Sequence, residues 1–281
     1  MTKILSSKKF ADNLIEEIKE EIDKFKIDAK LSIIRFGNDQ ADLAYEKGIK
    51  RSAEKTKIKV DVNELDENET QENLLKLIAK LNKDETVGGI LVYRPLPDHI
   101  DTKIIDQAID PKKDIDCMNP INKAKVYSGQ LDGFIPLAPL ASVKLLEFYD
   151  YDLESKNCVI INHSDVVGKP LAMLLLANWA SISICHVKTK NLKSYTKKAD
   201  IIFTAMGKAE MLDKSYFSKN STIIDIGLSK NDQGKLAGDL DEKDVTDYVE
   251  AYSPVPGGVG SITNLLLLKN VLKFYKKKSN G

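Results

Sequence analysis

The chain has 281 residues, of which 42 are Lys or Arg and 42 are Asp or Glu, so its formal net charge is zero. This length favours one large domain or two of moderate size, and it is sufficient for a sizeable core. The balanced charge indicates neither a groove for nucleic acid nor a basic face for a membrane, so we expect neither partner.

Cysteine usage and the N-terminal pattern predict a cytoplasmic protein. Cys117, Cys158 and Cys185 form no Cys-x-x-Cys pair, and the last two lie in apolar runs of strand type. We therefore expect reduced core thiols, with neither a zinc site nor disulfide bonds. The N-terminus passes at once into a charged amphipathic pattern, and no apolar run approaches about 18 residues, so we expect no export signal and no membrane span.

Patterns typical of helices and of strands alternate through the first half of the chain. Apolar residues recur every three or four positions from Phe10 to Phe25, which predicts a first helix. Residues 31–34 predict a strand, and a second helix is expected to begin near Asp39 and to carry Tyr45. The other expected elements are strands at 57–62 and 87–92 and helices around 74–81 and 104–108. Such alternation predicts a parallel sheet with helices on both faces.

A segment rich in Pro, Gly, Asn and Asp follows at residues 110–139 and is expected to be a long connection. After it we expect strands near Cys158, Ile182, Ile201 and Ile223 and a final helix over Asn264–Lys277. The predicted fold class is α/β with two domains. Residues 1–138 would form an αβ domain with a parallel sheet, and residues 139–263 a Rossmann-like dinucleotide-binding domain.

Two segments carry the strongest functional signals. Ser253-Pro-Val-Pro-Gly-Gly-Val-Gly-Ser-Ile-Thr263 combines two prolines, three glycines and no charge. Such a loop is stiff and has an exposed backbone, so it suits a flat polar ligand at a helix start. Asn162-His-Ser-Asp-Val-Val-Gly-Lys-Pro170 lies between a strand pattern and a helix pattern. That order is typical of a dinucleotide site, although the Gly-x-Gly-x-x-Gly fingerprint is absent.

Further motifs extend these signals over nearly the whole chain: Gly89-Ile-Leu-Val92 with Pro95-Leu-Pro97, Lys113-Asp-Ile-Asp116, Ile184-Cys-His-Val-Lys-Thr189, Ala199-Asp-Ile-Ile-Phe-Thr-Ala-Met-Gly207, Ile224-Asp-Ile-Gly227 and Gly238-Asp-Leu-Asp241. In this order they resemble the methylenetetrahydrofolate dehydrogenase/cyclohydrolase (FolD) family. The resemblance implies a folate-binding catalytic domain at 1–138, completed by a C-terminal helix at 264–281, with the active site in the cleft between the domains. It also implies a folate substrate, a nicotinamide cofactor and a homodimer.

The resemblance assigns the cofactor to the second domain. The expected cofactor contacts are Asn162, His163, Ser164, Val167, Gly168, Val187, Gly207 and Leu228. The pyrophosphate would lie at the helix start near Gly168, where backbone N–H groups favour anions. The nicotinamide would lie near Gly207, Leu228 and the Pro/Gly loop.

The choice between NAD and NADP can be examined at two positions. The family commonly holds the 2′-phosphate of NADP with an Arg and a Ser, where this sequence has His163 and Val187. Neither side chain suits a dianion, which favours NAD. NADP stays open, because no acidic residue closes the second strand to bind a ribose hydroxyl, and Lys188 and Lys190 could reach a phosphate.

The expected catalytic residues are Tyr45, Ile49, Tyr93 and Asp116. The family places a Tyr and a Lys one helical turn apart, facing the folate, and a Gln after the Gly-Ile-Leu-Val strand. Here Tyr45 is kept, but Ile49 replaces the Lys, and Tyr93, followed by Arg94, replaces the Gln. An isoleucine transfers no proton, so we expect oxidation of methylenetetrahydrofolate to persist and hydrolysis of the methenyl product to be weak or lost.

Two lysines lie close to Ile49 in sequence. At 3.6 residues per turn, Lys47 and Lys50 point about 160° and 140° away from the Tyr45 face, so neither is an easy substitute. Two alternatives stay open. One is a fully bifunctional enzyme that recruits Lys50 through a local helix irregularity, and the other is a catalytically silent paralogue that only binds ligand.

Asp116 and the Pro/Gly loop complete the expected folate site. A carboxylate suits the donor edge of a pterin, where an amino group and a ring N–H lie side by side. Alternatively, Asp114 and Asp116 only cap a turn. The expected loop contacts are Pro256, Gly257, Gly258, Val259 and Gly260. Cys117-Met118 and Pro136-Leu-Ala-Pro-Leu-Ala141 depart from the family pattern, so we expect an altered pocket wall.

Overall fold

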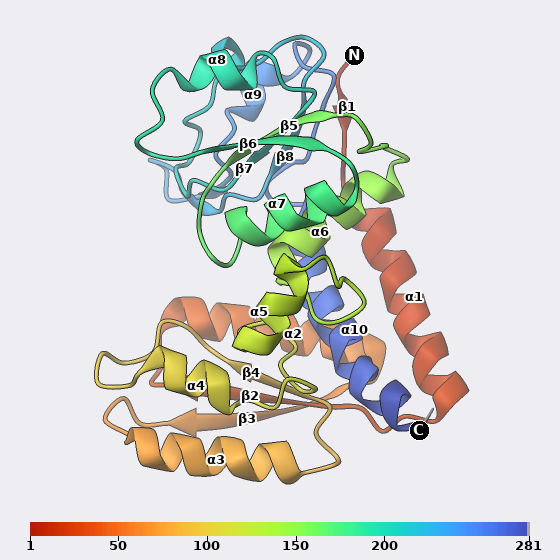
Figure 1. The fold of residues 1–281 in the computed structure, drawn as a ribbon, viewed down its shortest axis with the longest axis vertical. Helices are drawn as coiled ribbons and strands as arrows, with labels where there is room; N and C mark the ends of the chain where they lie inside the picture. Colours follow the sequence, from red (N-terminus) through yellow and green to blue (C-terminus); the bar gives the residue numbers. More distant parts are fainter. Residues whose placement is uncertain (280–281) are drawn as a thin grey trace. The chain divides into compact units, whose positions relative to one another are not determined.

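The computed structural model describes residues 1–279, with side chains up to Lys276, and it divides into two compact units (Figure 1). Unit 1 comprises residues 1–11, 126–131 and 136–263, and unit 2 comprises residues 12–125, 132–135 and 264 onward. The last two residues of the helix expected at 264–281 lie outside the described residues. Among the described residues, none of the helices combines the length and the apolar character needed to cross a bilayer.

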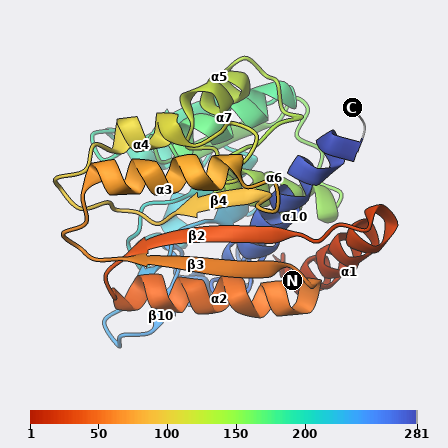
Figure 2. The same cartoon turned by 90° about the horizontal axis from the view of Figure 1, so that it is seen from below.

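Unit 2 is built on a three-stranded parallel sheet in the order β3-β2-β4, which Figure 2 shows side by side. Its elements are α1 (Lys8–Phe25, from residue 12), β2 (Lys30–Phe36), α2 (Gln40–Thr56), β3 (Lys59–Leu65), α3 (Gln71–Lys83), β4 (Gly89–Val92), α4 (Thr102–Ala108), α5 (Pro120–Tyr127, up to residue 125) and α10 (Gly260–Ser279, from residue 264). Helices α2 and α3 lie on opposite sides of the strands (Figure 1). Leu74 and Ile78 of α3 pack against Ile34 and other buried residues of the sheet. The predicted parallel sheet with helices on both faces is confirmed.

Side chains fix where the unit 2 helices begin. Asp39 accepts hydrogen bonds from the N–H groups of Ala41 (2.8 Å) and Asp42 (3.2 Å), so α2 begins where the sequence predicts. The strand expected at 57–62 instead occupies 59–65. Lys57 ends α2 in the left-handed conformation, with φ of 60°, and this delays the strand.

The segment at 110–139 has more structure than a connection needs, because it contains α5 and the first turn of α6 (Leu137–Phe148). Asp114 organises its first part. The Asp114 carboxylate accepts the N–H groups of Met118 (2.8 Å) and Asn119 (2.9 Å) and the side-chain amide of Asn122 (2.8 Å). The Asn and Asp residues that predicted a loop therefore serve as partners in a compact turn before a helix.

Unit 1 contains a six-stranded parallel sheet in the order β1-β11-β8-β7-β5-β6. The strands are β1 (Lys3–Ile4), β5 (Asn157–Ile161), β6 (Ser181–Cys185), β7 (Ile201–Thr204), β8 (Thr222–Asp225) and β11 (Ala251–Tyr252). The other elements are α6, α7 (Gly168–Ala177), α8 (Leu192–Thr196), a 3₁₀ turn (Lys214–Tyr216), α9 (Glu242–Val245) and the hairpin of β9 (Ser229–Lys230) and β10 (Leu236–Ala237). The four strands predicted here are confirmed, and the three cysteines are buried and free.

The order of the strands defines where a ligand of unit 1 is expected. Strand β5 pairs with β6 on one side and with β7 on the other, so the chain changes direction across the sheet at β5. In open parallel sheets ligands bind at the carboxyl ends of the strands beside such a point. The loops after β5 and β7 are therefore where a ligand of unit 1 is expected to bind.

Candidate active site

The unit 2 site centres on one face of α2. Tyr45 is 39 % exposed, whereas Ile49, one turn later, is 0 % exposed. An aliphatic side chain thus stands in the core next to the tyrosine. Burying an ammonium group there would cost much free energy unless it gained a partner.

Tyr93 lies beside Tyr45, with ring centroids 5.4 Å apart. The Tyr93 side chain is buried, and its hydroxyl has no hydrogen-bond partner among the described residues. Burial raises the pKa of both phenols, and the charge of Asp116 adds to the shift at Tyr45. Both hydroxyls are therefore protonated at neutral pH and are poor proton acceptors.

Lys50 is held away from this pair by Glu46. Its Nζ donates to Glu46 Oε1 at 2.6 Å, while the Nε of the buried Arg35 donates to Glu46 Oε2 at 3.1 Å. Although burial opposes ionisation, hydrogen bonds from Lys50 and Arg35 hold the pKa of Glu46 below its usual range. Residues Gln40 to Thr56 form one continuous α-helix. Lys50 is therefore paired with Glu46 and is not turned towards Tyr45 by an irregularity of the helix.

Asp116 is the acidic group of the site. Burial and the charge of Asp114 raise the pKa of Asp116 to about 7, while Arg94 and Lys123 oppose the shift. Asp114 organises the neighbouring turn, so the turn-capping role considered for both acids belongs to Asp114. Asp116 is left with a carboxylate that can accept hydrogen bonds from a ligand.

Arg94 also belongs to this cluster, although the motifs assigned it no role. Its Nη2 donates to the Asp106 carboxylate, and Lys123 Nζ lies 3.6 Å from the same group. Its charge is close enough to Asp116 to lower the pKa of that acid. The sequence signal for it was a charged residue in an otherwise apolar Gly-Ile-Leu-Val-Tyr segment followed by proline.

In unit 1, Asn162 ties together the loops on the two sides of the switch in strand order. Its Oδ1 accepts the N–H groups of Ser164 (2.8 Å) and Gly168 (3.0 Å), and its Nδ2 donates to the carbonyl of Ala205 (2.7 Å), which follows β7. A β-carbon on Gly168 would lie 2.1 Å from the Asn162 carbonyl oxygen. Only glycine fits this close approach, and α7 begins there without a side-chain cap.

Exposed side chains flank this point. Val187, after β6, is 81 % exposed, and Leu228, after β8, is 60 % exposed. Val167 is half-buried, and its N–H donates to the Ser164 hydroxyl at 3.1 Å. Apolar side chains standing in water at the carboxyl edge of a parallel sheet fit the rings of a dinucleotide.

Two of the histidines form a pair on the same edge. The exposed rings of His163 and His186 lie 5.3 Å apart, and His186 Nδ1 accepts the N–H of Lys188 at 3.1 Å. His186 therefore holds the turn that follows β6. The third histidine, His99, is also exposed.

Gly207 lies on a loop that is hydrogen-bonded to the Asp239 carboxylate. The sequence motifs did not predict this role for Asp239. Asp239 accepts the Thr204 hydroxyl (2.7 Å) and the N–H groups of Met206 (2.6 Å) and Lys208 (2.8 Å). A β-carbon on Gly207 would meet nothing within 4 Å, and a cavity of about 290 Å³ adjoins it. The loop therefore presents open backbone.

The Pro/Gly loop is anchored at its middle. Gly257 has φ of 108°, and its carbonyl accepts both the N–H and the hydroxyl of Ser7, each at 2.9 Å. A β-carbon on Gly258 would lie 2.5 Å from the Pro254 carbonyl oxygen, so glycine is needed there. Val259 is buried, whereas Pro256 and Gly260 are exposed and α10 begins at Gly260.

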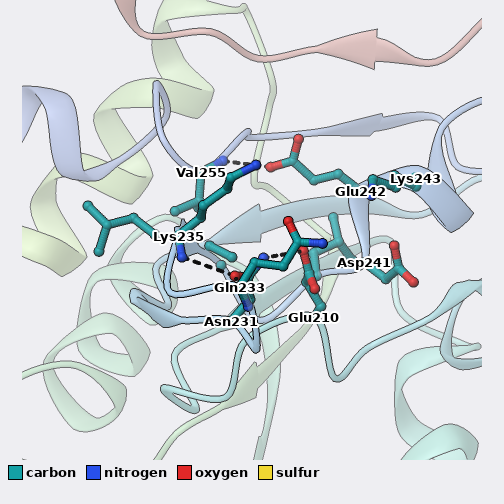
Figure 3. Close-up of a pocket in the computed structure, with 12 residues that line it drawn as sticks. Glu210, Asn231, Gln233, Lys235, Asp241, Glu242, Lys243 and Val255 are labelled. Atoms are coloured by element: carbon teal, nitrogen blue, oxygen red, sulfur yellow. Dashed lines mark hydrogen bonds between the residues drawn. The ribbon is translucent and has the colours of Figure 1, made fainter.

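A separate cavity of about 300 Å³ lies beside the β9–β10 hairpin (Figure 3). Its lining includes Glu210, Asn231 and Lys235, and Glu242 Oε1 accepts the N–H of Val255 there at 2.7 Å. None of the predicted site residues is among the described residues that line it.

The predicted residues thus fall into two groups. Tyr45, Ile49, Tyr93 and Asp116 lie together in unit 2, and the expected cofactor and loop residues lie in unit 1. Each group has its own geometry. In unit 2 an aromatic pair stands near a carboxylate, and in unit 1 open backbone surrounds a switch in strand order.

Comparison with known proteins agrees with both halves. Residues 5–116 match the family model "Tetrahydrofolate dehydrogenase/cyclohydrolase, catalytic domain", and residues 136–279 match the NAD(P)-binding domain of the same family. The chain is 46 % identical to the "Bifunctional protein FolD" of Clostridium botulinum (strain Okra / Type B1) over 282 residues, covering 99 % of this chain and 100 % of that protein.

Solved structures give the same result. The bifunctional FolD enzyme of Campylobacter jejuni is 39 % identical with a TM-score of 0.96, covering 99 % of this chain and 100 % of that one. The Trypanosoma brucei FolD structure, complexed with NADP and an inhibitor, is 26 % identical with a TM-score of 0.93, covering 100 % and 99 %. The chain therefore belongs to the tetrahydrofolate dehydrogenase/cyclohydrolase family, an enzyme family with an NAD(P)-binding domain.

Proposed function

We propose that this protein oxidises 5,10-methylenetetrahydrofolate to 5,10-methenyltetrahydrofolate with NAD(P)⁺, and that its cyclohydrolase activity is weak or lost. The proposal of weak or lost cyclohydrolase activity rests on the full burial of Ile49, one turn after Tyr45. This position has no group that can donate or accept a proton.

The oxidation needs little from these side chains beyond positioning. A lone pair on the neighbouring folate nitrogen expels a hydride from the one-carbon bridge, and the bound nicotinamide supplies the acceptor. Asp116 would accept hydrogen bonds from the amino group and ring N–H of the pterin, and Tyr45 and Tyr93 would bound its ring. The protein's work is to hold two rings in contact and to stabilise the developing cation.

Hydrolysis of the methenyl cation has different requirements, because water must lose a proton while a ring nitrogen gains one. Burial keeps the Tyr45 and Tyr93 phenols protonated, and Lys50 is paired with Glu46. These observations support a site that lacks a proton-transfer group where this step requires one.

In unit 1 we propose that Asn162, Ser164, Val167 and Gly168 hold the pyrophosphate, and that Gly207 and Leu228 contact the nicotinamide. The loop at 256–260 would contact substrate. NAD is the proposed cofactor, because the exposed His163 and Val187 offer a 2′-phosphate no fixed cation. The NADP bound to the Trypanosoma brucei relative supports the opposite choice, so binding of both must be measured.

The domain boundaries and cellular context are also proposals. Residues 1–138, with the helix from 264, would form the folate domain, and residues 139–263 the nucleotide domain. We further propose a homodimer in the cytoplasm.

Absorbance tests the proposed function. Purified protein is mixed with methylenetetrahydrofolate and NAD⁺ or NADP⁺, and reduced cofactor is followed first. Methenyltetrahydrofolate is then supplied alone, and loss of its chromophore is compared with the buffer rate. Cofactor reduction without enzymatic hydrolysis supports the proposal, whereas rapid hydrolysis supports the bifunctional alternative, which the name of the Clostridium botulinum relative favours. No activity in either assay supports a silent binding protein.

A further inference from the structure

Two consecutive residues at the end of β4 carry buried polar atoms without partners. The Tyr93 hydroxyl and the Arg94 Nε and Nη1 atoms are buried, and the described residues offer them no acceptor or donor. An unsatisfied buried polar group costs roughly 1–3 kcal/mol, and more when it is charged. Such a concentration of unmet groups at one place indicates that something outside the protein satisfies them.

Only one of the three guanidinium nitrogens of Arg94 has a hydrogen-bond partner among the described residues. Its Nη2 donates to Asp106, and that buried carboxylate is also 3.6 Å from Lys123 Nζ. Nε and Nη1 remain as donors, and they point from different edges of the planar group. Asp106 therefore anchors the guanidinium and leaves its donors for another acceptor.

A parallel bridge joins Ile90 of β4 to Asp114, so the segment that carries Asp116 runs beside β4 in the direction of Arg94. The charge of Arg94 opposes the rise in the pKa of Asp116 that burial causes. The two residues offer opposite chemistry, since Asp116 accepts hydrogen bonds and Arg94 donates them. A pterin ring presents a matching edge, on which an amino group and a ring N–H stand next to a carbonyl oxygen.

We propose that Arg94 is a specificity-determining residue that donates a hydrogen bond, from one of its two free groups, to the ring carbonyl of the pterin bound at Asp116. This inference rests on the proposed folate-binding function. It predicts that the protein distinguishes a 4-oxo pterin from its 4-amino analogue. The oxo group accepts a hydrogen bond from Arg94, whereas the N–H groups of the amino analogue would face the N–H groups of Arg94. A site that hydrogen-bonds an acceptor rejects an analogue lacking it, because its own buried donors are then unpaired.

The test compares affinities for folic acid and its 4-amino analogue, aminopterin, by calorimetric titration of the full chain. The variants are Arg94→Leu, Arg94→Lys and, as a control, Arg51→Leu, which removes an exposed guanidinium from α2 in the same unit. Hydrogen bonds to charged donors make the expected fall in the folic acid preference of Arg94→Leu about tenfold to hundredfold. Arg94→Lys keeps the charge without the planar fork and should recover only part of that preference.

The outcomes separate this inference from the function on which it rests. If the parent protein and Arg94→Leu bind folic acid with the same preference over aminopterin, the role of Arg94 is overturned and folate binding stands. If the parent protein binds neither folic acid nor tetrahydrofolate, both proposals fail. Circular dichroism of each variant identifies misfolded protein. Should Arg94→Leu misfold, the comparison of Arg94→Lys with the parent decides, and an unchanged preference there overturns the role.

Discussion

The ring of Tyr93 packs against that of Tyr45 with centroids 5.4 Å apart and planes tilted by 40°. Tyr45 lies one turn before Ile49, which replaces the Lys expected from the family resemblance, and Tyr93 itself replaces the expected Gln. Neither phenol ionises readily. We predict that Ile49→Lys combined with Tyr93→Gln raises methenyltetrahydrofolate hydrolysis at least about tenfold, within the range that a positioned proton-transfer group contributes. Loss of the methenyl absorbance measures it.

The matched control at the same position is Ile49→Val. It removes one methylene from a fully buried side chain, so we expect about 1 kcal/mol less stability and no gain in hydrolysis. A double variant that binds folate but hydrolyses no faster than Ile49→Val would refute the proposed reason for weak hydrolysis.

Stability should depend on pH through Asp116. Its folded pKa is raised to about 7, above the unfolded value near 3.8, so the folded state binds the proton more tightly. The free energy of unfolding therefore falls as pH rises from about 4 to about 7. Asp225 shares this direction, because burial and Asp239 raise its pKa to about 7 as well.

Asp116→Asn removes one of these two contributions. At pH 8 we expect it to raise the free energy of unfolding by on the order of 1 to 3 kcal/mol, with a smaller effect at pH 4, where both proteins are uncharged at this position. Urea unfolding at the two pH values measures the difference. An equal effect of the substitution at both pH values would show that the carboxyl does not titrate in this range.

Gly168 gives a prediction about the nucleotide site. Its missing β-carbon would overlap the Asn162 carbonyl oxygen, so Gly168→Ala must displace the loop after β5. We expect a loss of about 1 to 3 kcal/mol in stability and at least tenfold weaker NAD⁺ binding. Gly133→Ala is the control, because an added β-carbon there meets nothing within 4 Å. Thermal unfolding and cofactor titration should separate the two variants, and similar behaviour would contradict the steric account.

Cofactor preference can be shifted at two exposed positions. His163→Arg with Val187→Ser supplies a cation and a hydroxyl for a 2′-phosphate, so kcat/KM for NADP⁺ relative to NAD⁺ should rise about tenfold or more. The ratio in the parent protein tests the NAD preference itself. A parent that already prefers NADP⁺ would indicate that Lys188 or Lys190 binds the phosphate.

The sequence predicted those helices and strands whose apolar spacing or capping residue lies within a few positions of the chain. The apolar spacing from Phe10 to Phe25 marked α1, and Asp39 marked the start of α2. The pairing of β1 with β11 joins residues 3–4 to residues 251–252, and no local pattern reports such a distant contact. A β-strand of two residues also has too few positions for an alternation to be detected.

The candidate site shows the same division between local signals and distant contacts. Resemblance of motifs predicts Tyr45, Ile49 and Asp116 as site residues, because each stands at a fixed place in a segment. The partners of these residues were not accessible, since they depend on which side chains the fold brings together. Arg94 meeting Asp106 and Asp239 holding the Gly207 loop are contacts across the fold.

Helix α10 belongs to unit 2 from residue 264 and packs on β4, although residues 93–259 separate the two elements in the sequence. Added β-carbons on Gly88 and Gly89 would collide with Tyr275 and Val271, so the backbone of this helix lies directly on the start of β4. As the ribosome synthesises the chain from its N-terminus, β4 emerges long before its covering helix. Unit 2 therefore lacks its covering helix until residues 136–263 of unit 1 have been translated.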